Sequence, residues 1–534
     1  MGELDRVAGR SARAGLNLFV GNLLSEFINA GGAVVVARLL APGDYGVLSL
    51  AFVLPGIFVM FSDWGVSSAV TRLLARFQSR GRWSDVREVF RTGLLFNGAL
   101  TCFLSAAMFL AADPLAAIVL RRPELGGLVE LASILVVLQS VSTIAGSAFF
   151  GLERMDLMAA VKVAQSAVKA LASSMLVLRG YGVEGAVIGH LLGTGTVAVA
   201  SPILILWHSK GRKDVEGSDH GEDGSLRGML GFGFPLFVGN FLNTAGVRYQ
   251  GLLLAWFADN VAIGNLDIAN KFMSLVSLFT FPIKSVLYPT FSKFDYRRQP
   301  DELKRVFRVS VRYATLIVVP ATALIMTLSG QLVVFFFGQE YRLAPRFLSL
   351  VLLQFLPVTL GALSVFEFLN SQGDTVTSLR LIGVNVGLTM ALCTALTWRL
   401  GVMGLLAGVF VSMMAGWAYN LHRLHSKYGA GIDPDHAVRS VLFSSISALI
   451  SYASLMALDL SNAFAELALG SIAFSVACIF LAPLTGALTE RDLENIGRIL
   501  RRETPVYPVV APLLELEARI ICLKKQNTRI TARA

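Results

Sequence analysis

Long apolar stretches, separated by short segments rich in glycine, proline and charge, recur along most of this chain. A helix needs about 20 predominantly apolar residues to cross the hydrocarbon core of a bilayer. Of the 534 residues, 54% are hydrophobic and only 15% are charged, with a mean hydropathy of +0.64, whereas an ordinary soluble domain has about 25% charged residues. The pattern therefore predicts an all-α, polytopic membrane protein and argues against a soluble enzyme. About fourteen transmembrane helices are expected, at residues 16–40, 47–71, 93–112, 128–150, 159–178, 183–206, 229–257, 264–288, 313–337, 346–369, 378–398, 402–421, 438–459 and 463–486.

The distribution of lysine and arginine predicts the orientation of these helices, because insertion leaves positive flanks in the cytoplasm. A cytoplasmic N-terminus places the basic clusters at 72–91, 210–227 and 293–312 on one side and few basic residues on the other. The net charge of +10 is thus mostly a topology signal, and no nucleic-acid partner is expected. We expect a multi-pass protein of the plasma (inner) membrane with both termini in the cytoplasm.

Neither a catalytic domain nor a cofactor is expected. The outer loops are too short to carry an active site outside the lipid, and no G-x-x-x-x-G-K-[ST] motif for ATP binding occurs. The four cysteines lie far apart, which disfavours a metal site. Asp219, His220, Glu222 and Asp223 lie in a polar segment without fixed helical spacing, so we interpret that segment as a solvated tether.

The chain contains an internal repeat with a nearly constant offset. Phe19 to Asn22 recurs as Phe237 to Asn240, an offset of 218 residues, and two further motifs recur at offsets of 217 and 219 residues. These further motifs are Val89-Phe90-Arg91, matched by Val306-Phe307-Arg308, and Gly182-Val183 with Gly185 and Gly189, matched by Gly401-Val402 with Gly404 and Gly408. Each repeat holds six expected spans, an even number, so both copies enter the membrane from the same side.

Two parallel six-helix bundles follow from this parity, and such a layout is typical of a secondary transporter that binds its substrate between the halves. For the tail after residue 488, we leave open an interfacial helix over 506–523 or a disordered segment. The expected domains are an N-terminal bundle at 1–206, a cytoplasmic linker at 207–228, a C-terminal bundle at 229–424, two additional helices at 425–488 and a cytoplasmic tail at 489–534.

Polar residues inside the spans are the candidate site, because an ionisable group costs about 2.5 to 3.5 kcal/mol on insertion unless it faces water or a partner. Helical spacing places Asn22, Glu26 and Asn29 on one face of the first span. The equivalent face of the seventh span carries Asn240, Thr244 and Arg248. Because Asn22 and Asn240 are repeat equivalents, we expect these two faces to line a common cavity.

The remaining candidate site residues are charged residues inside the expected spans. Lys169 and Lys271 are further candidate lining cations, and Asp63 and Asp267 join Glu26 as possible coupling or counter-ion groups. Glu26 could neutralise Arg248 or bind a proton or sodium ion, Arg248 could instead form a structural ion pair, and Asp267 could simply pair with Lys271. Arginine binds phosphate oxygens through two parallel hydrogen bonds, so this cationic bias favours an anionic cargo.

The stretch Ala37-Arg-Leu-Leu-Ala-Pro-Gly-Asp-Tyr-Gly46, the run Phe232-Gly-Phe-Pro235 and the duplicated halves resemble the polysaccharide biosynthesis and O-antigen-type oligosaccharide flippases. These belong, with the multidrug and toxin extruders and the lipid II flippases, to one exporter superfamily. The resemblance implies a MATE-like fold, alternating access and a polyprenyl-linked oligosaccharide as cargo. It also implies membrane lipids, a polysaccharide polymerase and glycosyltransferases as partners.

We therefore expect a flippase for surface polysaccharide precursors, in exopolysaccharide, capsule or lipopolysaccharide assembly. Ser25-Glu26 stands where the lipid II branch carries an Arg-Asp pair, which argues against that branch. The alternative is a cation-coupled multidrug or metabolite antiporter of the same fold, which the acidic Glu26 keeps open. A membrane-embedded glycosyltransferase is disfavoured by the short outer loops.

Overall fold

The computed structural model is built from helices, with no strand among the residues that it describes. It describes residues 2–212, 214, 225–458, 460, 462–499, 512 and 515–521. The acidic segment with Asp219, Glu222 and Asp223 lies outside these residues. The chain divides into two compact units: unit 1 comprises Met1–Asp267 and Cys393–Leu405, and unit 2 comprises Ile268–Leu392 and Leu406–Ala534.

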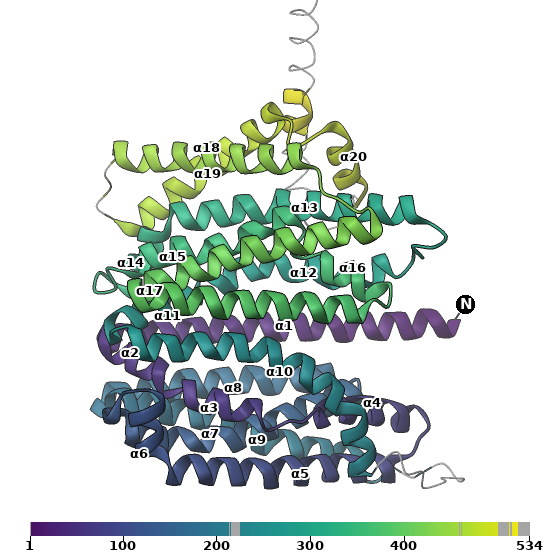
Figure 1. The fold of residues 1–534 in the computed structure, drawn as a ribbon, viewed down its shortest axis with the longest axis vertical. Coiled ribbons are helices and arrows are strands. Elements are labelled where there is room, and N and C mark those ends of the chain that lie inside the picture. Colours follow the sequence, from purple (N-terminus) through teal and green to yellow (C-terminus); the bar gives the residue numbers. More distant parts are fainter. Residues whose placement is uncertain are drawn as a thin grey trace, which may run out of the picture. The chain divides into compact units, whose positions relative to one another are not determined.

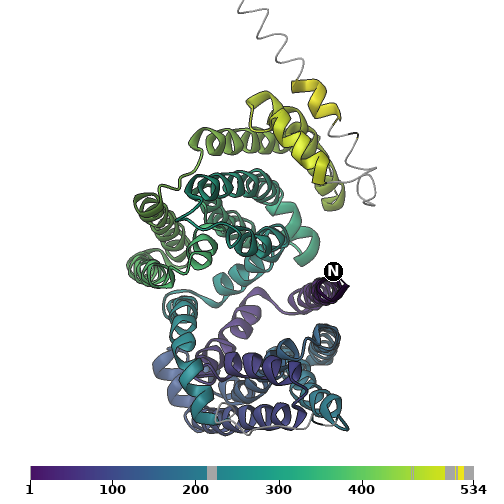
Figure 2. The same cartoon turned by 90° about the vertical axis from the view of Figure 1, so that its right-hand side faces the viewer.

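Unit 1 is a stack of long helices packed side by side (Figures 1 and 2). The most extensive contacts between its helices join α8 to α9 and α1 to α8. In addition, α10 packs on α3 and α4. Its helices are α1 (Gly2–Leu39), α2 (Pro42–Ala51), α3 (Val53–Met60), α4 (Val66–Ser79), α5 (Trp83–Leu110), α6 (Ala112–Pro114), α7 (Gly126–Gly151), α8 (Met155–Leu176), α9 (Gly182–Ser209), α10 (Leu226–Phe257) and most of α11 (Asn260–Lys271).

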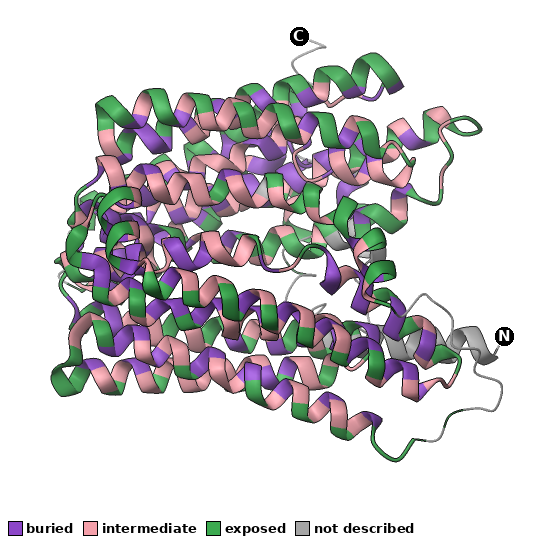
Figure 3. Cartoon of the chain, turned by 60° about the horizontal axis from the view of Figure 1, so that its bottom comes forward, coloured by how far each residue is buried: buried purple, intermediate pink, exposed green. Residues whose placement is uncertain are grey.

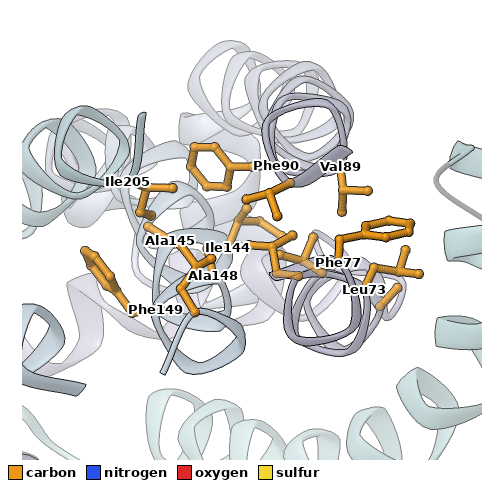
Figure 4. Close-up of a cluster of buried hydrophobic side chains, with 14 of the residues drawn as sticks. Leu73, Phe77, Val89, Phe90, Ile144, Ala145, Ala148, Phe149 and Ile205 are labelled. Carbon is orange, nitrogen blue, oxygen red and sulfur yellow. The ribbon is translucent and has the colours of Figure 1, made fainter. Parts of the chain in front are cut away.

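The core of unit 1 lies where α4, α5, α7 and α9 converge (Figure 4). Phe90 and Ile144 are fully buried there, and Phe77 and Phe149 are almost so. Away from this core, buried and exposed residues alternate along the same helices (Figure 3). One face of each such helix therefore packs on protein, while the other is free to contact lipid or water.

Unit 2 has its own aromatic core, in which Phe291 and Phe307 pack against Phe368 and Phe368 packs against Tyr428. The rings meet edge to face with centroids 5.2 to 5.7 Å apart, a favourable aromatic geometry. The helices are α12 (Met273–Phe291), α13 (Pro300–Thr327), α14 (Ser329–Phe337), α15 (Ala344–Leu352), α16 (Val365–Ser371), most of α17 (Thr375–Tyr428), α18 (Pro434–Leu458), α19 (Ala463–Thr485) and α20 (Glu490–Ile499).

The number of membrane crossings agrees with the expectation of a polytopic protein. Among the described residues, ten helices are long and apolar enough to span a bilayer, or up to twelve if each of two bent pairs is one span. Two of the ten, Met155–Ser209 and Thr375–Tyr428, have 55 and 54 residues, enough for two crossings each. The count of fourteen remains a prediction.

The internal repeat has a structural counterpart in the reversals of these two long segments. Gly182 has φ 51° and ψ −132°, and its repeat equivalent Gly401 has φ 56° and ψ −136°. A backbone conformation of this kind is open essentially to glycine alone. Each reversal is followed by a close approach of glycine to the preceding limb, at Gly185 to Leu176 and at Gly404 to Leu396. The same tight helical hairpin thus occurs once in each half.

Unit boundaries differ from the boundaries of the repeat. The expected linker at 207–228 is followed by α10, which packs on α3 and α4 within unit 1 rather than starting a new unit. The division of the chain by contacts therefore does not test the duplication, and the repeat-based domains remain a prediction.

Part of the tail is a helix packed on unit 2. Residues 515–521 are helical, and Ile521 is buried with Phe443 of α18, Ala482 of α19 and Leu493 of α20. At the start of α20, Arg312 of α13 forms an ion pair with Asp492. The described part of the tail therefore packs on the protein; the rest of the stretch 506–523 lies mostly outside the described residues.

Candidate functional site

Arg248 occupies an unusual place in unit 1, where α10 crosses α3. Its guanidinium lies against the backbone of Gly56, so that a Cβ at Gly56 would be 2.6 Å from Nη1 and 2.7 Å from Cζ. The side chain is half-buried, and its Nε is buried without a hydrogen-bond partner. No carboxylate of the described residues lies within ion-pair distance of it. A buried donor left unsatisfied costs about 1 to 3 kcal/mol.

Close glycine contacts on both sides of Arg248 hold α10 in this position. Gly233 of α10 touches the backbone at Gly65, and Gly251 approaches Val53 of α3. Further along, Gly264 of α11 touches the backbone of Pro42. Small residues let helix backbones approach closely, which is how membrane helices gain packing energy. Arg248 therefore projects from a helix that approaches its neighbours closely at glycines.

The rest of the predicted stripe on α10 has no partners among the described side chains. Asn240 is exposed and Thr244 is half-buried. One residue beyond Arg248, the hydroxyl groups of Tyr249 and Thr394 are 2.6 Å apart, which ties this part of α10 to the unit 1 portion of α17. Polar groups thus follow one side of α10 over two turns, and Arg248 is the charged one.

The predicted stripe on α1 has different surroundings, because α1 packs along α8. The Nζ of Lys162 donates to Oδ1 of Asn22 at 3.1 Å, and Nδ2 of Asn29 donates to Oγ of Ser166 at 2.8 Å. Between and beyond these bonds, Gly21 touches Ala159 and Gly32 touches Ala170. The order of these contacts shows that α1 and α8 run in the same direction. Asn22 and Asn29 therefore join two helices, which accounts for their polarity without a cargo.

Glu26 lies on the same helix but outside this contact. Its side chain is exposed, whereas the neighbouring Ser25 is buried. No ion pair between Glu26 and Arg248 occurs among the described residues. The expected counter-ion pair is therefore not formed in this structure, and a role of Glu26 in ion coupling remains a prediction.

The other predicted acidic and basic residues are spread over both units. Asp63 accepts hydrogen bonds from the backbone N–H of Ser67 at 2.9 Å and from its hydroxyl at 2.6 Å, so it satisfies donors in the first turn of α4. Lys169 is half-buried with its Cβ beside Gly193 of α9, and it has an interaction partner. On α11, Asp267 is half-buried and Lys271 is exposed, and each has an interaction partner.

Two residues of this region escaped the sequence analysis. Lys162 stands seven residues before Lys169 on α8, and this spacing on one helical face was the available signal. Gly56 gave no signal, because only the fold brings it under Arg248. No group of His, Cys, Asp and Glu suited to a metal ion occurs among the described residues.

Comparisons with known proteins agree with this fold. The chain is 22% identical to the "Probable low-salt glycan biosynthesis flippase Agl15" of Haloferax volcanii, over 78% of this chain and 84% of that protein. Its structure resembles the lipid II flippase MurJ in an inward closed conformation, with a TM-score of 0.65 and 13% identity, over 87% of this chain and 98% of MurJ. It also resembles an inward-facing multidrug resistance MATE family transporter, with a TM-score of 0.60 and 14% identity, over 77% of this chain and 98% of the transporter.

At these identities the two structural likenesses show a shared fold. They confirm the expected all-α, MATE-like architecture. The sequence model of one family, described as polysaccharide biosynthesis protein, matches residues 35–344. This match covers more than half of the chain, and the chain is therefore a member of the polysaccharide biosynthesis protein family.

Proposed function

We propose that this protein flips a polyprenyl-linked oligosaccharide across the plasma membrane during surface polysaccharide assembly. The family match and the similarity to a glycan biosynthesis flippase support this substrate class. The observation that carries the proposal is Arg248, a half-buried guanidinium in a membrane-spanning unit, with which no carboxylate of the described residues forms an ion pair. Placing such a charge in a membrane costs free energy, so charged residues are rare there and usually serve a function.

Arg248 is the anchor for the phosphate groups that join the sugars to the lipid. Its planar fork of N–H donors matches two phosphate oxygens at once. Thr244 and Asn240 lie one and two turns away on α10 and offer hydrogen bonds to sugar hydroxyls. Lys169 and Lys271 are the remaining cationic lining, with Glu26 and Asp267 as coupling groups. The cargo moves by alternating access while its hydrocarbon chain stays in the lipid.

The cellular setting follows from the same proposal. Both termini face the cytoplasm, where glycosyltransferases complete the lipid-linked precursor. A polysaccharide polymerase uses the precursor after it has been flipped. Transport draws on an ion gradient, on the membrane potential or on removal of the flipped product.

A second candidate function is a cation-coupled antiporter of drugs or metabolites. The observation that favours it is Glu26, an exposed carboxylate on α1 that is free to bind a proton or sodium ion. The multidrug transporter among the structural neighbours has this fold, but fold alone does not select the cargo.

A deletion strain separates the two functions. With the flippase function, loss of the gene abolishes surface glycan and leaves lipid-linked precursor on the cytoplasmic side of the membrane, and a plasmid-borne copy restores display. Surface glycan is measured by lectin or antibody labelling, and precursor by mass spectrometry of extracted lipids. Intact glycan combined with increased sensitivity to cationic dyes would overturn the flippase function and support the antiporter.

A further inference from the structure

We propose that Gly56 is a positioning residue for Arg248, and that it sets the plane in which the guanidinium meets a phosphate. This inference rests on the proposed function, because it concerns how the anion anchor is held. The observation behind it is the direct contact of the guanidinium with the Gly56 backbone, at distances where any Cβ would collide with Nη1, Cζ and Nε.

The contact is a specific one and not a general shortage of space. Gly56 is buried in α3, and the three heavy atoms nearest to the position of a Cβ all belong to Arg248. At Gly65 and Gly264 of the same seam, a Cβ would instead meet backbone, that of Gly233 and that of Pro42. Gly56 thus makes room for a side chain, whereas Gly65 and Gly264 make room for a neighbouring backbone.

This geometry determines which edge of the guanidinium is available. One face of the plane rests on the peptide backbone of α3, and Nε is enclosed without a partner. The two terminal nitrogen atoms then provide the donors for an anion, and their direction is fixed by the backbone beneath. A pre-organised fork loses less conformational freedom on binding than one that moves freely.

The same geometry predicts that a methyl group at position 56 moves the guanidinium without unfolding the protein. The end of a long side chain can rotate away, whereas a helix backbone cannot do so without loss of packing. Gly56→Ala should therefore leave folding nearly intact and weaken anion binding. A loss of one well-aligned charge-assisted hydrogen bond corresponds to a decrease in affinity of about tenfold.

The test measures the binding of inorganic pyrophosphate to the full-length protein in detergent, by calorimetry, for matched variants. Gly56→Ala should bind about tenfold more weakly than the wild type. Gly98→Ala on α5 is the control, because a Cβ there meets nothing within 4 Å, and it should bind as the wild type does. Lysine has no planar group to displace, so Gly56→Ala should cause no further loss in an Arg248→Lys background.

Each result decides between the inference and its alternatives. Wild-type affinity in Gly56→Ala, or an equal loss in the Arg248→Lys background, would overturn the positioning role. Equal pyrophosphate binding by the wild type and Arg248→Ala would remove Arg248 as the anion anchor and the inference with it. If Gly56→Ala has a lowered thermal midpoint, Arg248→Ala should restore it, since it removes the colliding group; a midpoint that stays low would also overturn the inference.

Discussion

α1 and α10 begin the two repeats and carry polar residues at the same helical spacing, yet these residues have different surroundings. On α1, Asn22 and Asn29 hydrogen-bond to Lys162 and Ser166 of α8. On α10, Asn240 and Arg248 have no polar partner among the described side chains. The stripe on α1 thus holds helices together, while the stripe on α10 keeps its polar groups available. The stripe on α10 is where we expect the cargo to bind.

The largest expected effect is on transport, and it distinguishes Arg248 from Lys162, which are both half-buried cations of unit 1. Arg248→Ala should lower glycan display by about 100-fold, because it removes paired charge-assisted hydrogen bonds to phosphate, and it should leave the protein level unchanged. Arg248→Lys should retain part of the activity through its point charge. Lys162→Ala is the matched control: because Lys162 already has a partner in Asn22, transport per molecule should stay near the wild-type value.

Lectin labelling normalised to membrane protein level checks this prediction, together with extraction of the lipid-linked precursor. Normal display by Arg248→Ala would remove the difference between α1 and α10 on which the proposed site depends. A transport defect of similar size in Lys162→Ala would mean that the α1 and α8 stripe also contacts the cargo.

The second prediction concerns two adjacent glycines of α1, and its readout is stability. A Cβ at Gly32 would lie 2.6 Å from Cβ and 2.9 Å from Cα of Ala170, whereas a Cβ at Gly31 meets nothing within 4 Å. Gly32→Ala should force α1 away from α8 and destabilise the protein by about 1 to 3 kcal/mol. Gly31→Ala should be neutral or slightly stabilising, since alanine favours a helix more than glycine does. Unfolding curves in mixed detergent micelles compare the two, and equal midpoints would contradict the packing of α1 on α8.

The parts of the fold and of the candidate site that the sequence predicts are those that depend on residues close together along the chain. The apolar spans follow from patterns along the chain, and the fold agrees with them. The repeat is a pattern of the same kind; Gly182 and its equivalent Gly401 share one backbone conformation, and the repeat-based domains remain a prediction. Helical spacing grouped Asn22, Glu26 and Asn29 on one face; Asn22 and Asn29 do face α8, whereas Glu26 is exposed outside this contact. Spacing says which residues share a face, but not what the face meets.

The residues that the sequence did not reveal are those whose role comes from a neighbouring helix. Gly56 looks like any glycine of an apolar span until α10 places Arg248 on it. Asp63 is a contrasting case: it is a candidate for ion coupling because an acid inside a span is expensive, and its carboxylate accepts two hydrogen bonds from Ser67, four residues further along the chain. The contact of Gly56 is thus made by the fold and is encoded by no period in the sequence, whereas the contact of Asp63 is local and its role in ion coupling remains a prediction.

The smallest expected effect contrasts two asparagines, one on each stripe. Asn29→Ala should lose the hydrogen bond to Ser166 and about 0.6 kcal/mol of stability, the average for such bonds between membrane helices, with transport per molecule unchanged. Asn240→Ala should show the reverse, because its exposed side chain has no described partner to lose and offers its hydrogen bonds to the cargo. Unfolding midpoints and normalised glycan display are measured for both variants. If both variants changed the unfolding midpoint alone, or both changed glycan display alone, the stripes on α1 and α10 would share one role. The distinction between a stripe on α1 that packs helices and a stripe on α10 that binds cargo would then be wrong.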